Sequence, residues 1–360
     1  MTFLDSLGID ALIVVGSTNR RYFSGWSADD HAPDRPSGVM LVEPNHTTLY
    51  ASATNLPWAE AEVLPGVTTV ELTGSWPGAL AGGIQARGFT VVGFEDTVTT
   101  VAHFRQLTEA LGDSVRLVPV ADAIDTLRAV KTERELGLIR QALDLTDIAF
   151  ERAAAHLQAG MTERQLADFI DQQFRDLGSD GQAFDTIVAS GPNAARPHHA
   201  PGNRVVEAGE PVIIDMGARV AGYCGDLTRT IWVGQSSSQL GTMYHLVAEA
   251  QRAAFAAISN GVDARAVDRA ARDVFAAAGV EHYFVHGLGH AIGLRIHESP
   301  FLGKQSRDIL KSGQVITIEP GVYIPDWGGV RIEDVVAVEE DGYTNLTRAP
   351  KLLDEGESPS

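Results

Sequence analysis

Two distant segments of this chain share one pattern of glycine, apolar and acidic residues, and this internal repeat constrains the fold more than any other feature of the sequence. The first covers residues 206–217 and the second residues 310–321. In each, a glycine precedes a short apolar strand, an acid follows that glycine by six residues, and a second glycine follows the acid by two. A further apolar stretch with one more acid, Asp226 or Glu333, comes after each segment. The pattern predicts two β-hairpins that are copies of one unit.

The four acids of these hairpins are predicted to face one another in pairs. Residues opposite each other in an antiparallel ladder have a constant sum of residue numbers, so a turn centred at 220–221 places Asp215 opposite Asp226. The second hairpin places Glu319 opposite Glu333 in the same way. Burying an unpaired carboxylate costs on the order of several kcal/mol, and two such pairs side by side repel each other unless a cation lies between them. The economical interpretation is a metal site.

Each acid taken alone has a second interpretation. An acid near the end of a strand is as often a solvated loop residue or the partner of an arginine. Chance rarely places acids twice at the same offset in the same glycine-strand-glycine frame, so the repetition favours the metal site.

Length, charge and cysteine content narrow the class of protein. A chain of 360 residues exceeds the ~250–300 residues at which single hydrophobic cores stop growing, so two domains are expected. A formal net charge of −19 disfavours nucleic acid and anionic membranes as partners. The single cysteine, Cys224, excludes an intrachain disulfide and fits a reducing compartment. Because no apolar run reaches the ~18 residues of a membrane span and no signal segment is evident, a cytoplasmic protein is expected.

The first third of the chain alternates between helical and extended patterns, which predicts an α/β domain over residues 1–124. Helices are expected over 3–7 and 101–111. Extended segments are expected over 11–15, 21–25, 39–42, 48–51 and 90–94.

From residue 125 onward the sequence is strongly helical. Thr132 and Thr162 each begin a capping box, which predicts one helix to about residue 157 and a second to about residue 177. Another pair of helices is expected after the first hairpin, over 240–259 and 264–278. Because helix, helix and hairpin occur twice, residues 125–360 are predicted to form an α+β domain with an internal pseudo-twofold repeat.

Histidines cluster in one glycine-rich segment. His286, His290 and His297 lie among glycines, where the backbone can approach a ligand closely. A second source is His198, with His199 beside it. Five others are expected to be structural, at positions 46, 103, 156, 245 and 282.

Together these residues resemble the pita-bread metallopeptidases, a family that includes methionine aminopeptidase, aminopeptidase P and proline dipeptidase. The motifs that carry the resemblance are IDMG at 214–217, GYCGDLTR at 222–229, HGLGH at 286–290, IEPG at 318–321 and GVRIED at 329–334. The proline-specific branch is the most similar, since this chain also has the N-terminal segment 21–25 and a joining segment through Arg128 and Lys131. The resemblance covers nearly the whole chain. It implies a pita-bread catalytic domain over 125–360 and a creatinase-like N-terminal domain over 1–124.

The resemblance also implies a dinuclear metal site. Its ligands would be Asp215, Asp226, His290, Glu319 and Glu333. Asp215 would hold one ion, His290 and Glu319 the other, and the two remaining acids would bridge both. Such hard ligands suit Mn²⁺ best, with Co²⁺, Zn²⁺ or Fe²⁺ as alternatives. The implied nucleophile is a hydroxide that bridges the metals, and Glu319 is the implied acceptor of a proton from the attacking water.

Further residues receive roles by the same resemblance. His198 and His297 match substrate-facing histidines, of which one stabilises the oxyanion and the other holds the peptide group. His286 is expected to line the pocket, with a structural role in its glycine turn as the alternative. Arg331, two residues from a ligand on a strand, is expected to hold a carboxylate. His199 is expected to take no part.

The implied substrate is a small peptide with proline at the second position, cleaved at its Xaa-Pro bond. A dipeptidase must hold a free carboxylate, ideally with an arginine, yet the residue after the segment 297–300 is Phe301. Arg295, Lys304 or a residue of a partner subunit are the alternatives for that role. The choice between dipeptidase and aminopeptidase therefore stays open, and a homodimer is implied by the resemblance.

Two other functions stay open at this point. A metal-free amidinohydrolase of the creatinase kind shares the fold, but it would not need all five ligands. A catalytically silent peptide-binding module is the third hypothesis. Loss of ligands would favour it, and none is lost.

Overall fold

The computed structural model describes residues 3–30, 32 and 34–351. The chain divides into two compact units, Met1–Leu127 and Arg128–Ser360. The division falls within helix α6 (Ala121–Ala129). Among the described residues, no helix combines the length and the apolar character needed to cross a membrane.

The N-terminal unit is built on one mixed six-stranded sheet. Its strands, in spatial order, are β4 (Val67–Glu71), β3 (Thr47–Ala51), β2 (Gly38–Val42), β1 (Ala11–Val14), β5 (Val91–Phe94) and β6 (Arg116–Pro119). Its helices are α1 (Phe3–Leu7), α2 (Ser17–Ser24), α3 (Leu56–Glu62), α4 (Trp76–Arg87) and α5 (Val101–Leu111). All of β1 is buried, with Ile13 in the apolar cluster on one face and Leu12 and Val14 in the cluster on the other. A continuous apolar strand is typical of a sheet that is covered on both faces.

The expectation of an extended segment over 21–25 is wrong, because these residues belong to helix α2 and its C-cap. The buried face of this helix is polar. Arg20 is fully buried and donates hydrogen bonds to three main-chain carbonyl oxygens and to Asp30. Hydrophobic periodicity does not detect such a face. Gly25 ends the helix with a left-handed φ of 80°.

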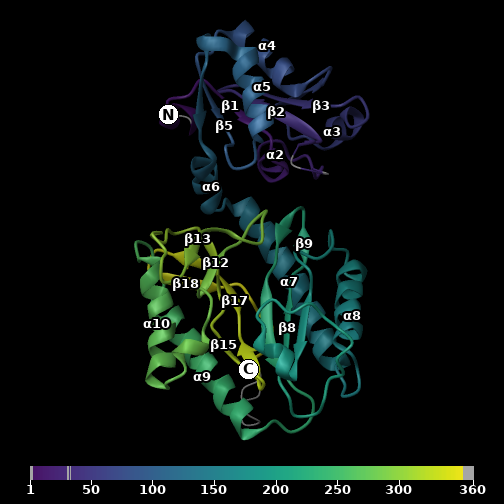
Figure 1. Ribbon diagram of the computed structural model, residues 1–360, viewed down its shortest axis with the longest axis vertical. Coiled ribbons are helices and arrows are strands. Elements are labelled where there is room, and N and C mark those ends of the chain that lie inside the picture. Colours follow the sequence, from purple (N-terminus) through teal and green to yellow (C-terminus); the bar gives the residue numbers. More distant parts are fainter. Residues whose placement is uncertain (1–2, 31, 33, 352–360) are drawn as a thin grey trace. The chain divides into compact units, whose positions relative to one another are not determined.

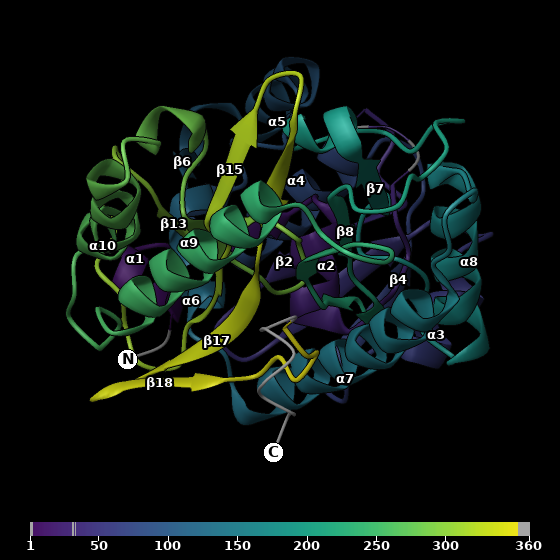
Figure 2. The same ribbon diagram turned by 90° about the horizontal axis from the view of Figure 1, so that it is seen from below.

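The C-terminal unit contains two pairs of helices. The first pair is α7 (Glu133–His156) and α8 (Glu163–Asp176), and the second is α9 (Ser238–Phe255) and α10 (Ala264–Ala277). Both expected capping boxes are present, one at Thr132 with Glu135 and one at Thr162 with Gln165. Figures 1 and 2 show the two pairs on opposite sides of this unit, with strands between them.

The strands of this unit form two larger sheets and two short ribbons. The three-stranded sheet has the order β11 (Leu227–Ile231), β8 (Val212–Met216) and β7 (Ile187–Ser190). The five-stranded sheet has the order β13 (Glu298–Leu302), β12 (Gly289–Ala291), β14 (Val315–Ile318), β17 (Asp334–Glu339) and β18 (Gly342–Asn345). The ribbons are β9 (Arg219–Val220) with β10 (Tyr223–Cys224), and β15 (Gly321–Ile324) with β16 (Gly328–Arg331). Each helix pair precedes strands that include one acid-bearing hairpin, so the internal repeat is confirmed.

The second hairpin has the predicted register. Gly321 pairs with Arg331, and Ile318 pairs with Asp334. The ladder is interrupted between these two pairs. Glu319 and Glu333 both lie within that interruption.

The predicted register of the first hairpin is wrong by two residues. Asp215 pairs with Thr228 and not with Asp226. The turn is centred one residue later than expected, at Ala221 and Gly222, which have φ values of 47° and 84°. Positive φ at both central residues gives a two-residue turn whose twist matches that of the strands, and a glycine favours this conformation.

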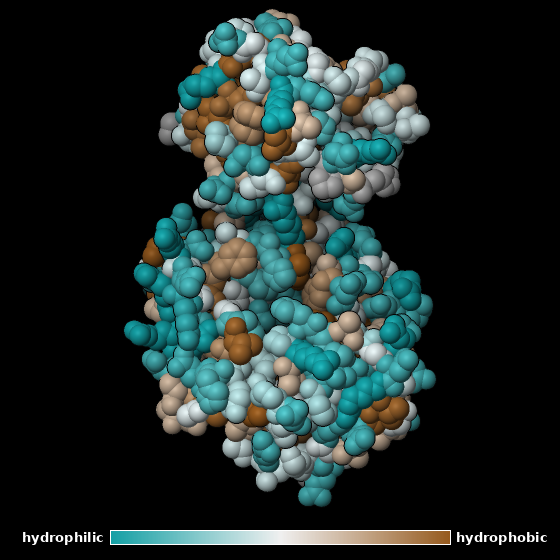
Figure 3. Space-filling model, in the orientation of Figure 1, coloured by the Kyte–Doolittle hydropathy of each residue, from teal (hydrophilic) through white to brown (hydrophobic). Residues whose placement is uncertain are grey.

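Hydrophilic residues dominate the face of the C-terminal unit that Figure 3 shows. Hydrophobic residues occur there singly or in small groups. Scattered exposed apolar side chains are normal in folded proteins and require no separate explanation.

Candidate metal centre

A cavity of about 1370 Å³ in the C-terminal unit is lined by residues from both halves of the repeat. Every residue that the sequence predicts for the site lines this cavity: His198, Asp215, Asp226, His286, His290, His297, Glu319, Arg331 and Glu333. Their positions span more than a third of the chain. The duplicated fold therefore brings all of the predicted site residues to one place.

In each hairpin, one of the predicted acidic ligands lies where the strand is interrupted. Asp226 lies between β10 and β11, and Glu333 lies between β16 and β17. In the first hairpin the strands cross so closely that a Cβ atom added to Gly217 would lie 2.0 Å from the carbonyl oxygen of Gly225. Only glycine fits such a crossing. The repeated glycines of the sequence thus permit the interruption at which Asp226 leaves the ladder.

The ligating atoms of three residues are already close together. Asp226, His290 and Glu333 are buried, and each offers one atom within 4.8 Å of the others. The Nε2 atom of His290 lies 3.8 Å from Oδ2 of Asp226 and 3.4 Å from Oε1 of Glu319. The fourth acid, Asp215, has a buried Oδ1 atom without a hydrogen-bond partner among the described residues.

Burial shifts the pKa values of this group strongly. It raises the pKa of Asp226 well above its usual value, with the negative charges of Glu333 and Asp215 adding to the effect. Burial also raises the pKa of Glu319 to about 8 and lowers that of His290 to about 4. His290 is therefore neutral and has a lone pair to offer a metal. Oxygen donors with an orphaned buried atom and a neutral imidazole fit a divalent first-row cation, because its charge would compensate the gathered acids.

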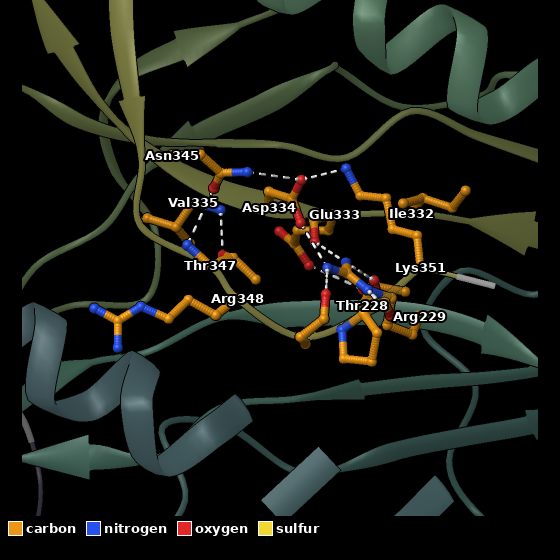
Figure 4. A network of polar contacts seen from close by, with 12 residues as sticks. Thr228, Arg229, Ile332, Glu333, Asp334, Val335, Asn345, Thr347, Arg348 and Lys351 are labelled. Atoms are coloured by element: carbon orange, nitrogen blue, oxygen red, sulfur yellow. Dashed lines mark hydrogen bonds and ion pairs between the residues drawn. The ribbon is translucent and has the colours of Figure 1, made fainter. Parts of the chain in front are cut away.

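Asp334, the acid next to Glu333, is buried beside two cations that compensate its charge. Its carboxylate lies 2.7 Å from Nη2 of Arg229 and 2.6 Å from Nζ of Lys351. Although burial opposes its charge, Arg229 and Lys351 hold the pKa of Asp334 below its usual value. Figure 4 shows this network, in which Arg229 also donates to the main-chain oxygen of Glu333. Cations thus compensate the structural acid and fix the strand, whereas no arginine or lysine among the described residues forms an ion pair with Asp226 or Glu319.

Arg331 lies beside the gathered acids and carries a positive charge. It is buried and donates to Oδ2 of Asp215 at 2.7 Å, to the hydroxyl of Thr228 at 3.0 Å and to the hydroxyl of Tyr323 at 2.8 Å. Although burial opposes the charge, Tyr323 and Asp215 raise the pKa of Arg331 above its usual value. The guanidinium therefore stays charged and fixes one oxygen of Asp215, which leaves Oδ1 directed elsewhere.

His286 continues the chain of hydrogen bonds that begins at Arg331. Its Nε2 lies 2.8 Å from the Tyr323 hydroxyl, and its Nδ1 lies 2.7 Å from the carbonyl oxygen of Gly287. A carbonyl only accepts, so Nδ1 carries the proton and Nε2 accepts from the Tyr323 hydroxyl. Burial, followed by the charge of Arg331, lowers the pKa of His286 to about 3. His286 is therefore a neutral residue whose ring is fixed at the cavity wall.

His198 and His297 are the exposed histidines of the cavity. The His297 ring lies 4.4 Å from that of His290, edge to face. Burial, followed by the charge of His198, lowers the pKa of His297, while Asp215 opposes this shift. Both rings therefore lie within electrostatic range of the gathered acids.

Sequence reasoning missed Tyr323, although a signal for it exists. In the second hairpin Gly321 faces Arg331, and Tyr323 lies two residues farther on the same face of the ribbon. The glycine leaves the space, since a Cβ atom at Gly321 would lie 2.7 Å from the Tyr323 hydroxyl. The sequence also provided no indication of a role for Glu163 or for His199. In the structure, Nε2 of His199 lies 2.8 Å from Oε2 of Glu163.

Four largely buried carboxylates, of which only Asp215 has an arginine or lysine partner among the described residues, gather around a neutral imidazole in a duplicated α+β fold. Such a group characterises a metal-dependent hydrolase. The particular family follows from comparison with known proteins. This chain belongs to metallopeptidase family M24, whose model matches residues 137–340. Residues 2–130 match the creatinase/prolidase N-terminal domain. Membership in this family implies divalent metal ions, for which the residues present are suited.

Similar proteins extend over almost the whole chain. The Xaa-Pro dipeptidase of Pyrococcus furiosus is 34% identical over 354 residues, which cover 98% of this chain and 97% of that protein. The structure of an Xaa-Pro dipeptidase from Bacillus anthracis gives a TM-score of 0.90 at 32% identity and covers 97% of this chain and 96% of that one. An X-Pro aminopeptidase from Thermotoga maritima gives a TM-score of 0.88 at 31% identity, with 96% and 98% covered. Relatives named as dipeptidase and as aminopeptidase are thus about equally similar to this chain.

Proposed function

We propose that this protein is a dinuclear metal-dependent exopeptidase that hydrolyses the Xaa-Pro bond of dipeptides or short peptides. The observation that carries the proposal is the buried group of Asp226, His290 and Glu333, whose ligand atoms lie within 4.8 Å of one another beside a large cavity. The substrate class is supported by relatives named Xaa-Pro dipeptidase.

In this proposal all five predicted ligands hold metal. Asp215 contributes to one ion, and its orphaned Oδ1 atom is the oxygen available for it. His290 and Glu319 would hold the other ion, and Asp226 and Glu333 would complete the ligand set of the pair. When bound, the two ions supply an activated water and positive charge at the substrate carbonyl. Mn²⁺ is the metal we propose, because oxygen donors predominate.

The side chains around the ligands carry out the remaining steps. Glu319 accepts the proton of the attacking water, for which a carboxylate at the edge of the metal group is suited. His198 and His297 donate hydrogen bonds to the carbonyl oxygen and to the peptide group, where charge develops in the transition state. Arg331 keeps Asp215 in place through the 2.7 Å contact. The fixed His286 ring forms part of the wall against which the proline packs.

We propose that both dipeptides and short peptides are substrates. The cavity of about 1370 Å³ exceeds the ~300–1,000 Å³ of typical small-ligand pockets. Phe301 lines the cavity with 48% of its surface exposed, and Lys304 is engaged by Glu281 at 2.9 Å. Neither residue is a dedicated site for a free carboxylate, so a requirement for a dipeptide is not built into these positions.

The remaining features of the proposal concern the whole protein. All of the proposed site residues lie within 125–360, which we propose as the catalytic domain, with 1–124 as an accessory domain. We propose a cytoplasmic homodimer. The single cysteine, Cys224, is buried and cannot form an intrachain disulfide, which is compatible with a reducing compartment. Light scattering of the purified protein would test the dimer.

The decisive experiment is hydrolysis of Ala-Pro and Ala-Pro-Ala by protein that has been stripped of metal and reloaded with Mn²⁺. Asp226→Asn is the inactive variant, and Asp144→Asn, at a partly exposed position of α7 outside the cavity, is its matched control. Metal stoichiometry is measured on the same samples by calorimetry. Cleavage of both peptides by wild type and by the control alone is the expected result.

The other outcomes are distinct. Cleavage of the tripeptide alone would identify an aminopeptidase. Binding of two ions without cleavage of either peptide would reject proline specificity and point to another amide substrate. Failure to bind any metal would reject the metal centre itself.

A further inference from the structure

We infer that Glu163 and His199 are positioning residues that hold the segment on which His198 faces the cavity. The inference rests on the proposed function, because that proposal gives His198 its contact with substrate. It assigns a role to His199, for which sequence reasoning expected none.

Both carboxylate oxygens of Glu163 accept hydrogen bonds from residues of the segment 190–202. Glu163 is the first residue of α8, and its side chain is completely buried. Its Oε1 accepts from the main-chain N–H and the hydroxyl of Ser190 and from the amide of Asn193, at 2.8–2.9 Å. Its Oε2 accepts from the main-chain N–H of Gly202 at 3.1 Å and from His199 Nε2 at 2.8 Å. One carboxylate therefore fixes both ends of the segment 190–202 and two points between them, Asn193 and His199.

The charge of Glu163 is maintained by these contacts. Burial acts to raise its pKa, but the hydrogen bonds from Asn193, Ser190 and His199 hold the pKa below its usual value. An ionised carboxylate only accepts hydrogen bonds, so Nε2 of His199 carries the proton it donates. Hydrogen bonds to a charged acceptor are stronger than neutral ones, and this makes the anchor stiff.

His198 has no anchor of its own. No described residue forms a hydrogen bond with its ring, and the residue is exposed. The position of the ring is therefore set by the main chain on either side. On one side the carbonyl oxygen of Pro197 accepts from Nη1 of Arg331 at 3.4 Å, and on the other side the ring of His199 is bound to Glu163.

One of these attachments links the segment to a proposed metal ligand, because Arg331 binds Pro197 and also binds Asp215. The other attachment links it to α8, of which Glu163 is the first residue. The segment that carries His198 is thus held between the metal group and a helix, a geometry in which a small displacement removes a hydrogen bond to the transition state. The His199 side chain is only 11% exposed and is engaged by Glu163, so it acts through its neighbour.

The first test uses His199→Leu, which removes the donor, and His199→Gln, whose amide N–H restores it. We expect His199→Leu to lower kcat/KM for the cleaved Xaa-Pro peptide on the order of 10-fold to 100-fold with unchanged metal content, and His199→Gln to recover most of the loss. His156→Leu, at an exposed position of α7 outside the cavity, is the control and should leave activity unchanged. Should His199→Leu fail to fold, His199→Asn, which is too short to reach Glu163, replaces it.

A double-mutant cycle with His198→Ala separates positioning from a direct role. If His199 acts through its neighbour, His199→Leu should cost less than about 3-fold in the His198→Ala background. The same loss in both backgrounds would overturn the inference, because His199 would then act without His198.

Crystal structures of wild type and His199→Leu give a readout that does not depend on activity. We expect His198 to move or to lose its order in the variant, while the metal ligands stay in place. An unchanged position of His198 overturns the inference even if activity falls. A wild-type protein that cleaves no Xaa-Pro peptide would reject the proposed function, and the two crystal structures would still decide whether His199 positions His198.

Discussion

At the scale of single residues, the proposed role of Glu319 in function is accompanied by a cost to stability. Its carboxyl is buried beside other acids, and burial raises its pKa to about 8. Glu319→Gln keeps the shape and removes the charge. We expect the metal-free variant to be more stable than metal-free wild type by about 1–3 kcal/mol, because an uncompensated buried acid is removed. Metal affinity and kcat/KM should both fall, by about 100-fold or more.

Denaturant unfolding of the metal-free proteins and calorimetric metal titration measure the two effects. Glu340→Gln is the matched control, because Glu340 is an exposed acid bonded by Asn260. It should change neither quantity. A metal-free Glu319→Gln protein that is less stable than wild type would show that Glu319 is compensated within the chain.

Tyr323→Phe tests the hydrogen bonds between Arg331 and His286. The hydroxyl accepts from Arg331 at 2.8 Å and donates to His286 at 2.8 Å. Its removal leaves two buried groups with one partner fewer, at a cost of about 1–3 kcal/mol in the free energy of unfolding. We expect kcat/KM to fall about 10-fold, because Arg331 and the wall of the cavity lose their fixed positions.

The control for this change is Tyr343→Phe, which removes an exposed hydroxyl from a ring stacked on Phe255. It should alter stability and kcat/KM by little. Equal effects of the two substitutions on kcat/KM would mean that the chain from Arg331 to His286 has no part in activity.

At the scale of elements, Asp147 joins helix α7 to the last described segment of the chain. Its carboxylate accepts from the main-chain N–H groups of Arg348 and Ala349 at 2.9 and 3.1 Å. Burial raises the pKa of Asp147 from 3.8 to about 6. Because the folded pKa is the higher one, the stability contributed by this group is fully present below about pH 4 and is lost as the pH rises through about 6.

The prediction concerns the difference in free energy of unfolding between wild type and Asp147→Asn. Lowering the pH from 7 to 5 should shift this difference in favour of wild type by about 1 kcal/mol. Denaturant unfolding at both pH values measures it. Asp168→Asn, at an exposed position of α8, should show no such shift. A difference that moves in the opposite direction would contradict the assignment of the raised pKa.

At the scale of the whole molecule, we expect metal binding and folding to be coupled. The proposed ligands come from both halves of the repeat, so only the folded C-terminal unit assembles them. A ligand that binds the folded state alone stabilises it by about 2.7 kcal/mol at a concentration 100 times its Kd. We therefore expect Mn²⁺ to raise the melting temperature of stripped protein and a chelator to reverse the change.

Scanning calorimetry with and without Mn²⁺ measures this coupling. The Asp226→Asn variant is the control, since it retains the fold but lacks a proposed bridging ligand. Its melting temperature should respond much less to Mn²⁺. Equal responses of wild type and variant would place the metal elsewhere on the protein.

Much of the fold follows from local sequence. The capping boxes at Thr132 and Thr162 fix where two helices begin, because a cap is formed by residues three apart. The register of the second hairpin also follows from local sequence, and its turn lies at Asp326, which has a positive φ of 62°. Helix α2 was mistaken for an extended segment because its buried face is polar, and the partners of Arg20 are distant or main-chain atoms.

By itself, the sequence determined the duplicated architecture and the family to which the chain belongs, and it identified the acids and histidines that we propose for the site. These properties are recorded in residue types at fixed spacings. Tertiary structure alone decided that Asp215 faces Thr228, that Tyr323 joins Arg331 to His286 and that Glu163 holds His199. The pairing of Asp215 with Thr228 depends on the conformation of one turn. The contacts of Tyr323 and of Glu163 join residues that are far apart in the chain or on different strands. Spacing along a sequence carries no information about such contacts until packing brings the segments together.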